Sequence, residues 1–166
     1  MRTAMISMSQ IKDNSTSFLI AAMLLVVAGA AVFLLISQLQ PTTVLSFGGN
    51  IFKARIASTP SSREKGLGGV TELGPQQAMI LAFPSDDAWQ IWMKDMKVPL
   101  DIVWLNYDKK VVYWRKTASP DGSTNVTFTP TSRARYVVEL PVGSIESQHI
   151  QTGDTASFEI KLGDVK

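Results

Sequence analysis

Residues 18–36 constrain the fold most, because this stretch contains no charged and no polar side chain. As an α-helix it would be about 28 Å long, close to the roughly 30 Å hydrocarbon core of a bilayer. We therefore expect a transmembrane signal-anchor helix at residues 17–38. It would follow a tail of residues 1–16, and a tether of residues 39–44 would join it to a folded domain of residues 45–166.

The charges beside this stretch predict its orientation. Arg2 and Lys12 precede it together with one acid, Asp13, whereas no charged residue follows it before Lys53. Because Lys and Arg near a span favour the cytoplasmic side, we expect a single-pass plasma-membrane protein with the N-terminus in the cytoplasm and the folded domain outside. The alternative is a cleaved signal peptide, with an Ala-Gly-Ala sequence as the cleavage site. Apolar sequence continues to Ile36, which is longer than such signals usually are and favours the uncleaved anchor.

Charge and cysteine content exclude several function classes for the folded domain. The chain has 16 Lys and Arg against 14 Asp and Glu, and removing the tail's two basic residues and one acid leaves 14 against 13. A nearly neutral domain lacks the positive excess that nucleic-acid binding needs. The absence of cysteine excludes disulfides, thiol catalysis and Cys-ligated zinc. The single histidine, His149, is typical of a helix terminus, so we expect neither a metal nor another cofactor.

Apolar runs and alternating patterns predict a mainly β fold for this domain. One short helix has clear end signals, because Thr59 can cap it, Pro60 suits its first position and Gly66 can end it. A second short helix is expected at 144–149, and a long polar loop at 117–131. Strands are expected at residues 51–57, 79–83, 89–93, 101–106, 111–116, 135–140 and 156–161. This pattern predicts a small barrel or a rolled antiparallel sheet with two short helices.

Five ordered motifs run through the domain. The central motif is a Trp-Met pair followed by Pro-Leu-Asp-Ile, and it is preceded by an apolar strand that ends in Pro and by an Arg-Glu-Lys-Gly-Leu element. The residues are Arg63 to Leu67, Met79 to Pro84, Trp92, Met93, Pro99 to Ile102, Ala134 to Leu140, Gly143, Gly153 and Asp154. Over about residues 45–162 the chain resembles the uncharacterised prokaryotic family called domain of unknown function 192.

The resemblance implies a compact, mainly β fold that is often sent outside the cytoplasm behind a signal or an anchor. It implies no reaction. Many members carry cysteines in the loop equivalent to residues 117–131, and this chain has none. A role that depends on those thiols therefore does not transfer to this chain.

Asp101 is the polar residue that the sequence explains least, because it begins an otherwise apolar strand. A buried carboxylate must be hydrogen-bonded or paired, and pairing with Arg63 would tie the first short helix to the sheet. In the functional interpretation, Asp101, Asp95 and Glu139 converge with Arg63 or Lys94 on a cleft. They would then act as general acid and base, or bind a ligand. Both interpretations stay open at this point.

The four tryptophans pose a similar choice. We expect Trp104 and either Trp92 or Trp114 in the core, whereas a tryptophan at a sheet edge would offer a flat platform for a sugar ring. Combined with the charged residues above, the candidate functional cluster consists of Arg63, Trp92, Lys94, Asp95, Asp101 and Glu139.

These observations favour a non-enzymatic module that binds a ligand or a partner at the cell envelope. A glycan, a cell-wall fragment or another membrane protein would be its ligand. The alternative is a carboxylate-dependent, hydrolase-like enzyme with Asp101 and Asp95 as its pair. In a third interpretation the protein is a scaffold, and the anchor helix at 17–38 carries the partner contact.

Overall fold

A computed structural model describes residues 8–37, 40–120 and 126–166, and the chain forms two compact units, Met1–Leu39 and Gln40–Lys166. We refer to Gln40–Lys166 as the C-terminal unit. The predicted tail, tether and polar loop each include residues outside the described ranges. The two units are described separately below.

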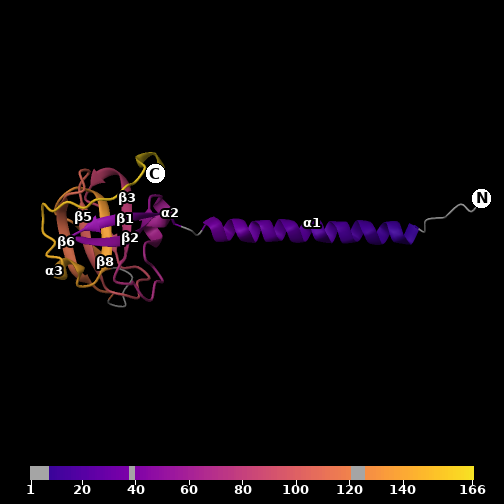
Figure 1. The fold of residues 1–166 in the computed structure, drawn as a ribbon, viewed down its shortest axis with the longest axis horizontal. Coiled ribbons are helices and arrows are strands. Elements are labelled where there is room, and N and C mark those ends of the chain that lie inside the picture. The colour runs from indigo at the N-terminus through magenta and orange to yellow at the C-terminus, as the bar shows by residue number, and fades with distance from the viewer. Residues whose placement is uncertain (1–7, 38–39, 121–125) are drawn as a thin grey trace, which may run out of the picture. The chain divides into compact units, whose positions relative to one another are not determined.

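The described residues of the first unit form one helix, α1 (Met8–Ser37), which covers the apolar stretch (Figure 1). Over residues 17–30 its side chains are exposed, apart from the half-buried Ala22. Within the described residues, no helix is long and apolar enough to cross a membrane. The transmembrane helix expected at 17–38 therefore stays a prediction.

The C-terminal unit is built on one six-stranded sheet in which β8 lies between β3 and β5 (Figure 1). A second sheet pairs β4 (Ile91–Trp92) with β7 (Thr127–Phe128). The strands of the large sheet, in spatial order, are β1 (Thr42–Phe47), β2 (Asn50–Ala57), β3 (Gln77–Asp87), β8 (Ala134–Pro141), β5 (Leu100–Leu105) and β6 (Val111–Ala118).

The mainly β prediction is confirmed, with two differences. All neighbours in the large sheet are antiparallel except β2 and β3, which run parallel, so the sheet is mixed rather than antiparallel. The described strands form no closed barrel, because β1 and β6 remain the two edges of the sheet. The parallel pair requires a crossover connection, since a tight turn can join only antiparallel strands.

The connection between β2 and β3 contains α2 (Pro60–Lys65). This helix begins and ends where the sequence signals predict. The Thr59 hydroxyl accepts from the backbone N–H of Ser62, and the Ser62 hydroxyl accepts from the Thr59 N–H, which forms a capping box. Pro60 occupies the first turn, and Gly66 ends the helix at a φ of 47°. This short helix was predicted with the correct bounds.

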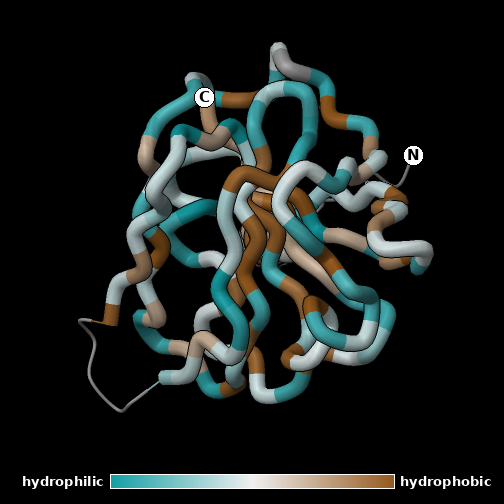
Figure 2. Tube along the Cα trace, turned by 90° about the vertical axis from the view of Figure 1, so that its left-hand side faces the viewer, coloured by the Kyte–Doolittle hydropathy of each residue, from teal (hydrophilic) through white to brown (hydrophobic). Residues whose placement is uncertain are grey.

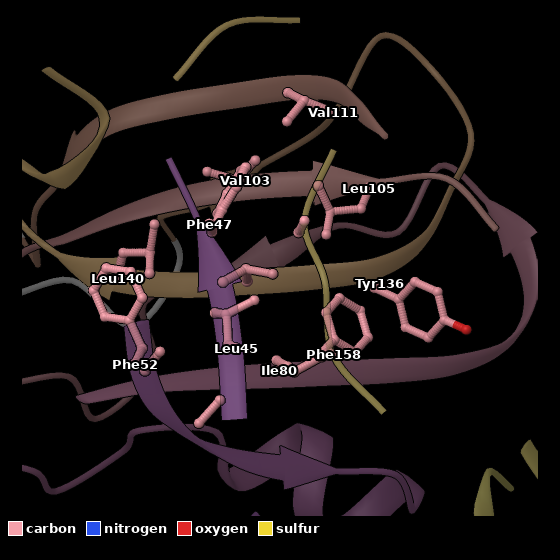
Figure 3. Close-up of a cluster of buried hydrophobic side chains, with 14 of the residues drawn as sticks. Leu45, Phe47, Phe52, Ile80, Val103, Leu105, Val111, Tyr136, Leu140 and Phe158 are labelled. Atoms are coloured by element: carbon pink, nitrogen blue, oxygen red, sulfur yellow. The ribbon is translucent and has the colours of Figure 1, made fainter. Parts of the chain in front are cut away.

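Each face of the large sheet packs against its own apolar cluster. The first cluster includes Leu45 and Phe47 of β1, Val103 of β5 and the C-terminal Phe158, as Figure 3 shows. The second consists of residues from β2, β3, β5, β6 and β8 together with residues outside the large sheet, namely Leu67, Ile91, Met93 and Met96. Strand β5 contributes to both and is buried along its whole length, as its continuous apolar sequence predicts. Figure 2 shows hydrophobic residues along the inner strands and hydrophilic residues on the turns.

The segment after α3 (Ser144–Ser147) closes the first cluster. Isolated bridges join Ser157 to Ser46 and Thr155 to Lys110, so this segment lies between the two edges of the sheet. The strand predicted at 156–161 is wrong, because only these single bridges form and the chain ends in a 3₁₀ turn, η1 (Leu162–Asp164). Its apolar alternation arises because Ala156 and Phe158 point into the core.

Candidate functional site

A cavity of about 180 Å³ opens between the end of α2, strand β3, residues 90–96 and strand β8. We call it the Glu139 cavity. Four of the six predicted cluster residues line it, namely Arg63, Trp92, Lys94 and Glu139. The remaining lining residues are Glu64, Lys65, Gly66, Leu67, Leu81, Phe83, Gln90, Ile91 and Met96.

Glu139 is the buried acid of this cavity. It is 4% exposed, and its register neighbours are Met79 of β3 and Ile102 of β5, both apolar and fully buried. Among the described residues, its Oε2 atom has no hydrogen-bond partner. Burial raises the pKa of Glu139 from 4.5 to about 7, and the positive charge of Arg55 opposes this rise. The site therefore holds a carboxyl group that is half-protonated near neutral pH.

Arg63 fastens α2 to the sheet instead of pairing with Asp101. Its Nη1 donates to the carbonyls of Ser58 and Ala82, each at 2.9 Å, and its Nη2 donates to the Lys166 carbonyl at 2.7 Å. The guanidinium also lies 5.0 Å from the centre of the Phe83 ring. Partial burial lowers the pKa of the Arg63 guanidinium below its ordinary value. The predicted lock between helix and sheet exists, but carbonyl oxygens form it.

Gly66 lies beside the buried acid, and its backbone conformation rather than the available space favours glycine. A Cβ atom at this position would lie 3.9 Å from Glu139 Oε1 and 4.0 Å from Oε2. The φ of 47° is also one that side chains with a Cβ rarely adopt. The Gly in the Arg-Glu-Lys-Gly-Leu element therefore helps to form the wall of the cavity as well as to end the helix.

Charged and aromatic groups stand at the mouth of the cavity. Lys94 Nζ lies 4.9 Å from the Trp92 ring centre and 3.5 Å from Glu64 Oε1. Both charged side chains are well exposed, at 41% and 61%, so this ion pair is weak and easily rearranged. Trp92 is 41% exposed and offers part of its ring to solvent.

The tryptophan expectations are confirmed in part. Trp104 is fully buried, and its indole N–H donates to the Trp89 carbonyl at 2.8 Å. Trp92 and Trp114 are both partly exposed, at 41% and 38%, so the expectation that one of them would join the core is wrong. Trp89 instead stacks on Phe83 at 4.3 Å between ring centres.

Asp101 and Asp95 are not among the residues that line the cavity, although Asp95 lies between two that do, Lys94 and Met96. Asp101 is fully buried, and its two oxygens accept from the backbone N–H groups of Thr117, at 2.9 Å, and Ile145, at 2.8 Å. It points to the first apolar cluster, whereas Glu139 points to the second, on the opposite face of the sheet. Asp95 is exposed at a φ of 59°, in a turn. The two aspartates predicted as a catalytic pair thus share no lining of this cavity.

The cavity combines an inner carboxyl group, apolar walls and a mouth with cationic and aromatic groups. Such an arrangement can take up a small molecule and supply a hydrogen-bonding partner at its inner end. Within the described residues, no three His, Asp or Glu side chains come together as a metal site requires. The apolar wall residues Leu67, Phe83 and Met96 were not in the predicted cluster. Two of the motifs noted in the sequence contain Leu67 and Phe83, so a signal for these two residues was present.

Comparison with known proteins shows that residues 43–158 match the DUF192 family, described as Uncharacterized ACR. UPF0127 proteins of Thermococcus kodakarensis and Thermococcus gammatolerans are 29% and 32% identical over 106 and 107 residues. These matches cover 64% and 63% of this chain, and 64% and 65% of the relatives, so the chain spans less than two thirds of either relative's length.

Two solved structures share the fold. A protein of unknown function from Novosphingobium aromaticivorans has a TM-score of 0.63 and 28% identity, covering 70% of this chain and 83% of that one. A Sinorhizobium meliloti protein, provisionally described as a transcription regulator, has a TM-score of 0.64 and 21% identity. That match covers 72% of this chain and 94% of the other, and at this identity it shows the fold alone.

Proposed function

The chain belongs to the DUF192 family, and we propose that its C-terminal unit is a module that binds a small polar ligand in the Glu139 cavity. One observation carries this proposal: Glu139 Oε2 is buried beside the cavity without a hydrogen-bond partner. Leaving a buried polar atom unpaired costs about 1–3 kcal/mol, and more for a charged group. A ligand that supplies the missing partner would remove this cost.

The size of the cavity limits what can enter. An engineered cavity of about 150 Å³ holds one benzene molecule, so a cavity of about 180 Å³ suits a molecule of similar or slightly larger size. Of the envelope ligands considered from the sequence, a whole glycan or protein is too large to be enclosed. Part of one sugar unit, or one small terminal residue of a cell-wall fragment or of a membrane protein, would fit.

The test is a ligand titration of the full chain in detergent. Because Trp92 lines the cavity, its fluorescence should respond to occupancy. Sugars, amino acids, lipid headgroups and cell-wall fragments form the panel, and Glu139→Gln is the test variant. The exposed Glu159→Gln is the matched control. We expect at least one saturable response that Glu139→Gln abolishes and the control retains. A panel without a response, or responses unchanged by Glu139→Gln, would contradict the proposal.

Acid–base catalysis is a second candidate function, and the pKa of Glu139 near 7 favours it. A hydrolase based on the Asp101–Asp95 pair has less support, because both Asp101 oxygens are occupied by backbone amides. An enzyme would therefore use Glu139 as its acid or base. Turnover of a bound panel compound, lost in Glu139→Gln, would favour catalysis, whereas recovery of the unchanged compound would favour binding alone.

We further propose that residues 17–38 anchor the protein in the plasma membrane, with the C-terminal unit outside. The support is the uncharged apolar sequence of residues 18–36, the helical conformation of α1 and the basic residues before it. A reporter enzyme that is active only outside the cytoplasm, fused after Lys166, should be active. An inactive but well-expressed fusion would refute this orientation. N-terminal sequencing of the mature protein distinguishes the anchor from a cleaved signal peptide.

A further inference from the structure

The geometry points to a small zwitterion as the ligand: a free α-amino acid of about the size of alanine, whose ammonium group binds Glu139 and whose carboxylate lies near Lys94 at the mouth. This inference rests on the proposed function, because it names the ligand class of the same cavity. Three features of the lining lead to it, namely a missing donor, a cation at the mouth whose partner can be exchanged and a limited apolar volume.

The missing donor identifies the inner end of the ligand. Glu139 Oε2 has no partner, and the polar side chains nearby are directed elsewhere. The Arg63 guanidinium donates to three carbonyls, Lys94 pairs with Glu64, and the Gln90 amide donates to Thr129 Oγ1 at 3.0 Å. An ammonium group offers three N–H donors and a positive charge, and charge-assisted hydrogen bonds to a carboxylate are about twice as strong as neutral ones.

The charge at the mouth identifies the outer end. The cation at the mouth is Lys94, which lies beside the acid Glu64. Lys94 already balances Glu64 through an exposed ion pair, and exchanging that partner for a ligand carboxylate costs little. An anionic group at the mouth and a cationic group beside Glu139 match the charges of the lining. A zwitterion carries both groups a few bonds apart.

The apolar walls set the size of the side chain. Leu67, Leu81, Phe83 and Met96 contribute apolar surface to the lining. Each methylene group that is buried should raise the affinity about fourfold, so alanine should bind more tightly than glycine. A volume of about 180 Å³ has room for a small aliphatic amino acid and not for phenylalanine or tryptophan. The affinity should therefore rise from glycine to alanine and then fall for phenylalanine and tryptophan.

The pH dependence distinguishes an ammonium ligand from a neutral one. An ammonium group requires ionised Glu139, whose pKa is about 7. The charged groups near this acid are one cation on β2 and the residues of the mouth, namely Arg55, Arg63, Glu64, Lys65 and Lys94. We expect the affinity for alanine to be about 100-fold weaker at pH 5 than at its plateau above pH 7. A neutral hydrogen-bond acceptor would show the opposite trend.

The experiment titrates the full chain in detergent with alanine and two analogues, followed by tryptophan fluorescence. Lactate replaces the amine with a hydroxyl group, and alaninamide removes the carboxylate. We expect each analogue to bind at least tenfold more weakly than alanine. Glu139→Gln should weaken alanine binding at least tenfold, Lys94→Gln should weaken it to a smaller extent, and the control Glu159→Gln should leave it unchanged. Thermal unfolding of each variant establishes that it is folded.

The outcomes separate this inference from the proposed function. Saturable, Glu139-dependent binding of lactate or of another compound without an amine, at an affinity equal to that of alanine, overturns the zwitterion and leaves the cavity as a binding site. No response to any amino acid up to its solubility limit also overturns the inference, and the wider panel then decides the proposed function. Alanine binding that Glu139→Gln leaves unchanged overturns both.

Discussion

The buried Glu139 predicts an unusual pH dependence of stability. Its pKa is raised from 4.5 to about 7 by burial, so between these two values the folded chain keeps a proton that the unfolded chain releases. Stability rises with pH only where the unfolded state binds more protons, and here the folded state binds more. This residue therefore makes stability fall as the pH rises from about 4.5 to about 7. Above pH 7 its effect is constant.

The magnitude follows from the size of the shift. A rise from 4.5 to about 7 corresponds to about 3 kcal/mol of stability lost across this window, because one pKa unit is worth 1.36 kcal/mol. Glu139→Gln replaces the acid with a neutral group of the same shape and removes this titration. We expect the variant to match the parent chain near pH 4 and to be more stable by about 3 kcal/mol at pH 8. For a domain of this size that is about 10 °C in Tm.

The assay is thermal or urea unfolding of the full chain in detergent, without ligand, followed by tryptophan fluorescence. All 4 tryptophans lie between Trp89 and Trp114, so the signal reports the C-terminal unit alone. The measured quantity is the difference in the free energy of unfolding between the parent chain and Glu139→Gln at each pH. The other titrating groups contribute equally to both chains, so their effects cancel in this difference. The exposed Glu159→Gln should give a difference close to zero throughout. A difference for Glu139→Gln that does not change between pH 4 and pH 8 would refute the reasoning.

Three further variants test the packing around the site, all measured in the same unfolding assay. Asp101→Asn should lower the free energy of unfolding by about 3 kcal/mol, because the new amide NH₂ group cannot accept from the backbone N–H that an Asp101 oxygen now satisfies. The exposed Asp95→Asn should leave stability nearly unchanged. An unchanged stability for Asp101→Asn would return this residue to the functional candidates. Thr59→Ala should cost about 1 kcal/mol through loss of the α2 cap, and a neutral result would show that the capping box does not form. Gly66→Ala should cost about 1–3 kcal/mol because its φ is positive, and a stabilised variant would refute this backbone conformation.

Local signals in the sequence predicted the local structure well. The bounds of α2 follow from Thr59, Pro60 and Gly66, which act through contacts within a few residues. The continuous apolar run that forms β5 predicted a strand buried on both faces, and the structure confirms it. In α2 and β5 the residues that decide the conformation are close together in the chain, so the local sequence pattern is sufficient to predict the structure.

Strand order and the site could not be predicted in the same way. The helix predicted between β2 and β3 is compatible with a parallel crossover, but it does not show that these two strands are neighbours, because the choice of partner depends on packing across the whole sheet. Similarly, the predicted cluster contained both Asp101 and Glu139, but a sequence does not reveal that these residues face opposite sides of the sheet. Without that knowledge, the acid that satisfies two backbone amides cannot be distinguished from the acid that has no partner.

The central position of β8 has a consequence for how the chain reaches its folded state. This strand is the last to be synthesised, yet it fills the gap between β3 and β5, and its pairing of Glu139 with Met79 joins residues far apart in the chain. Until residues 134–141 are available, β3 and β5 each present an open apolar edge. Pairings of this kind form slowly, and open edges promote aggregation. A chain interrupted before β8 should therefore yield an aggregating fragment rather than a smaller stable domain.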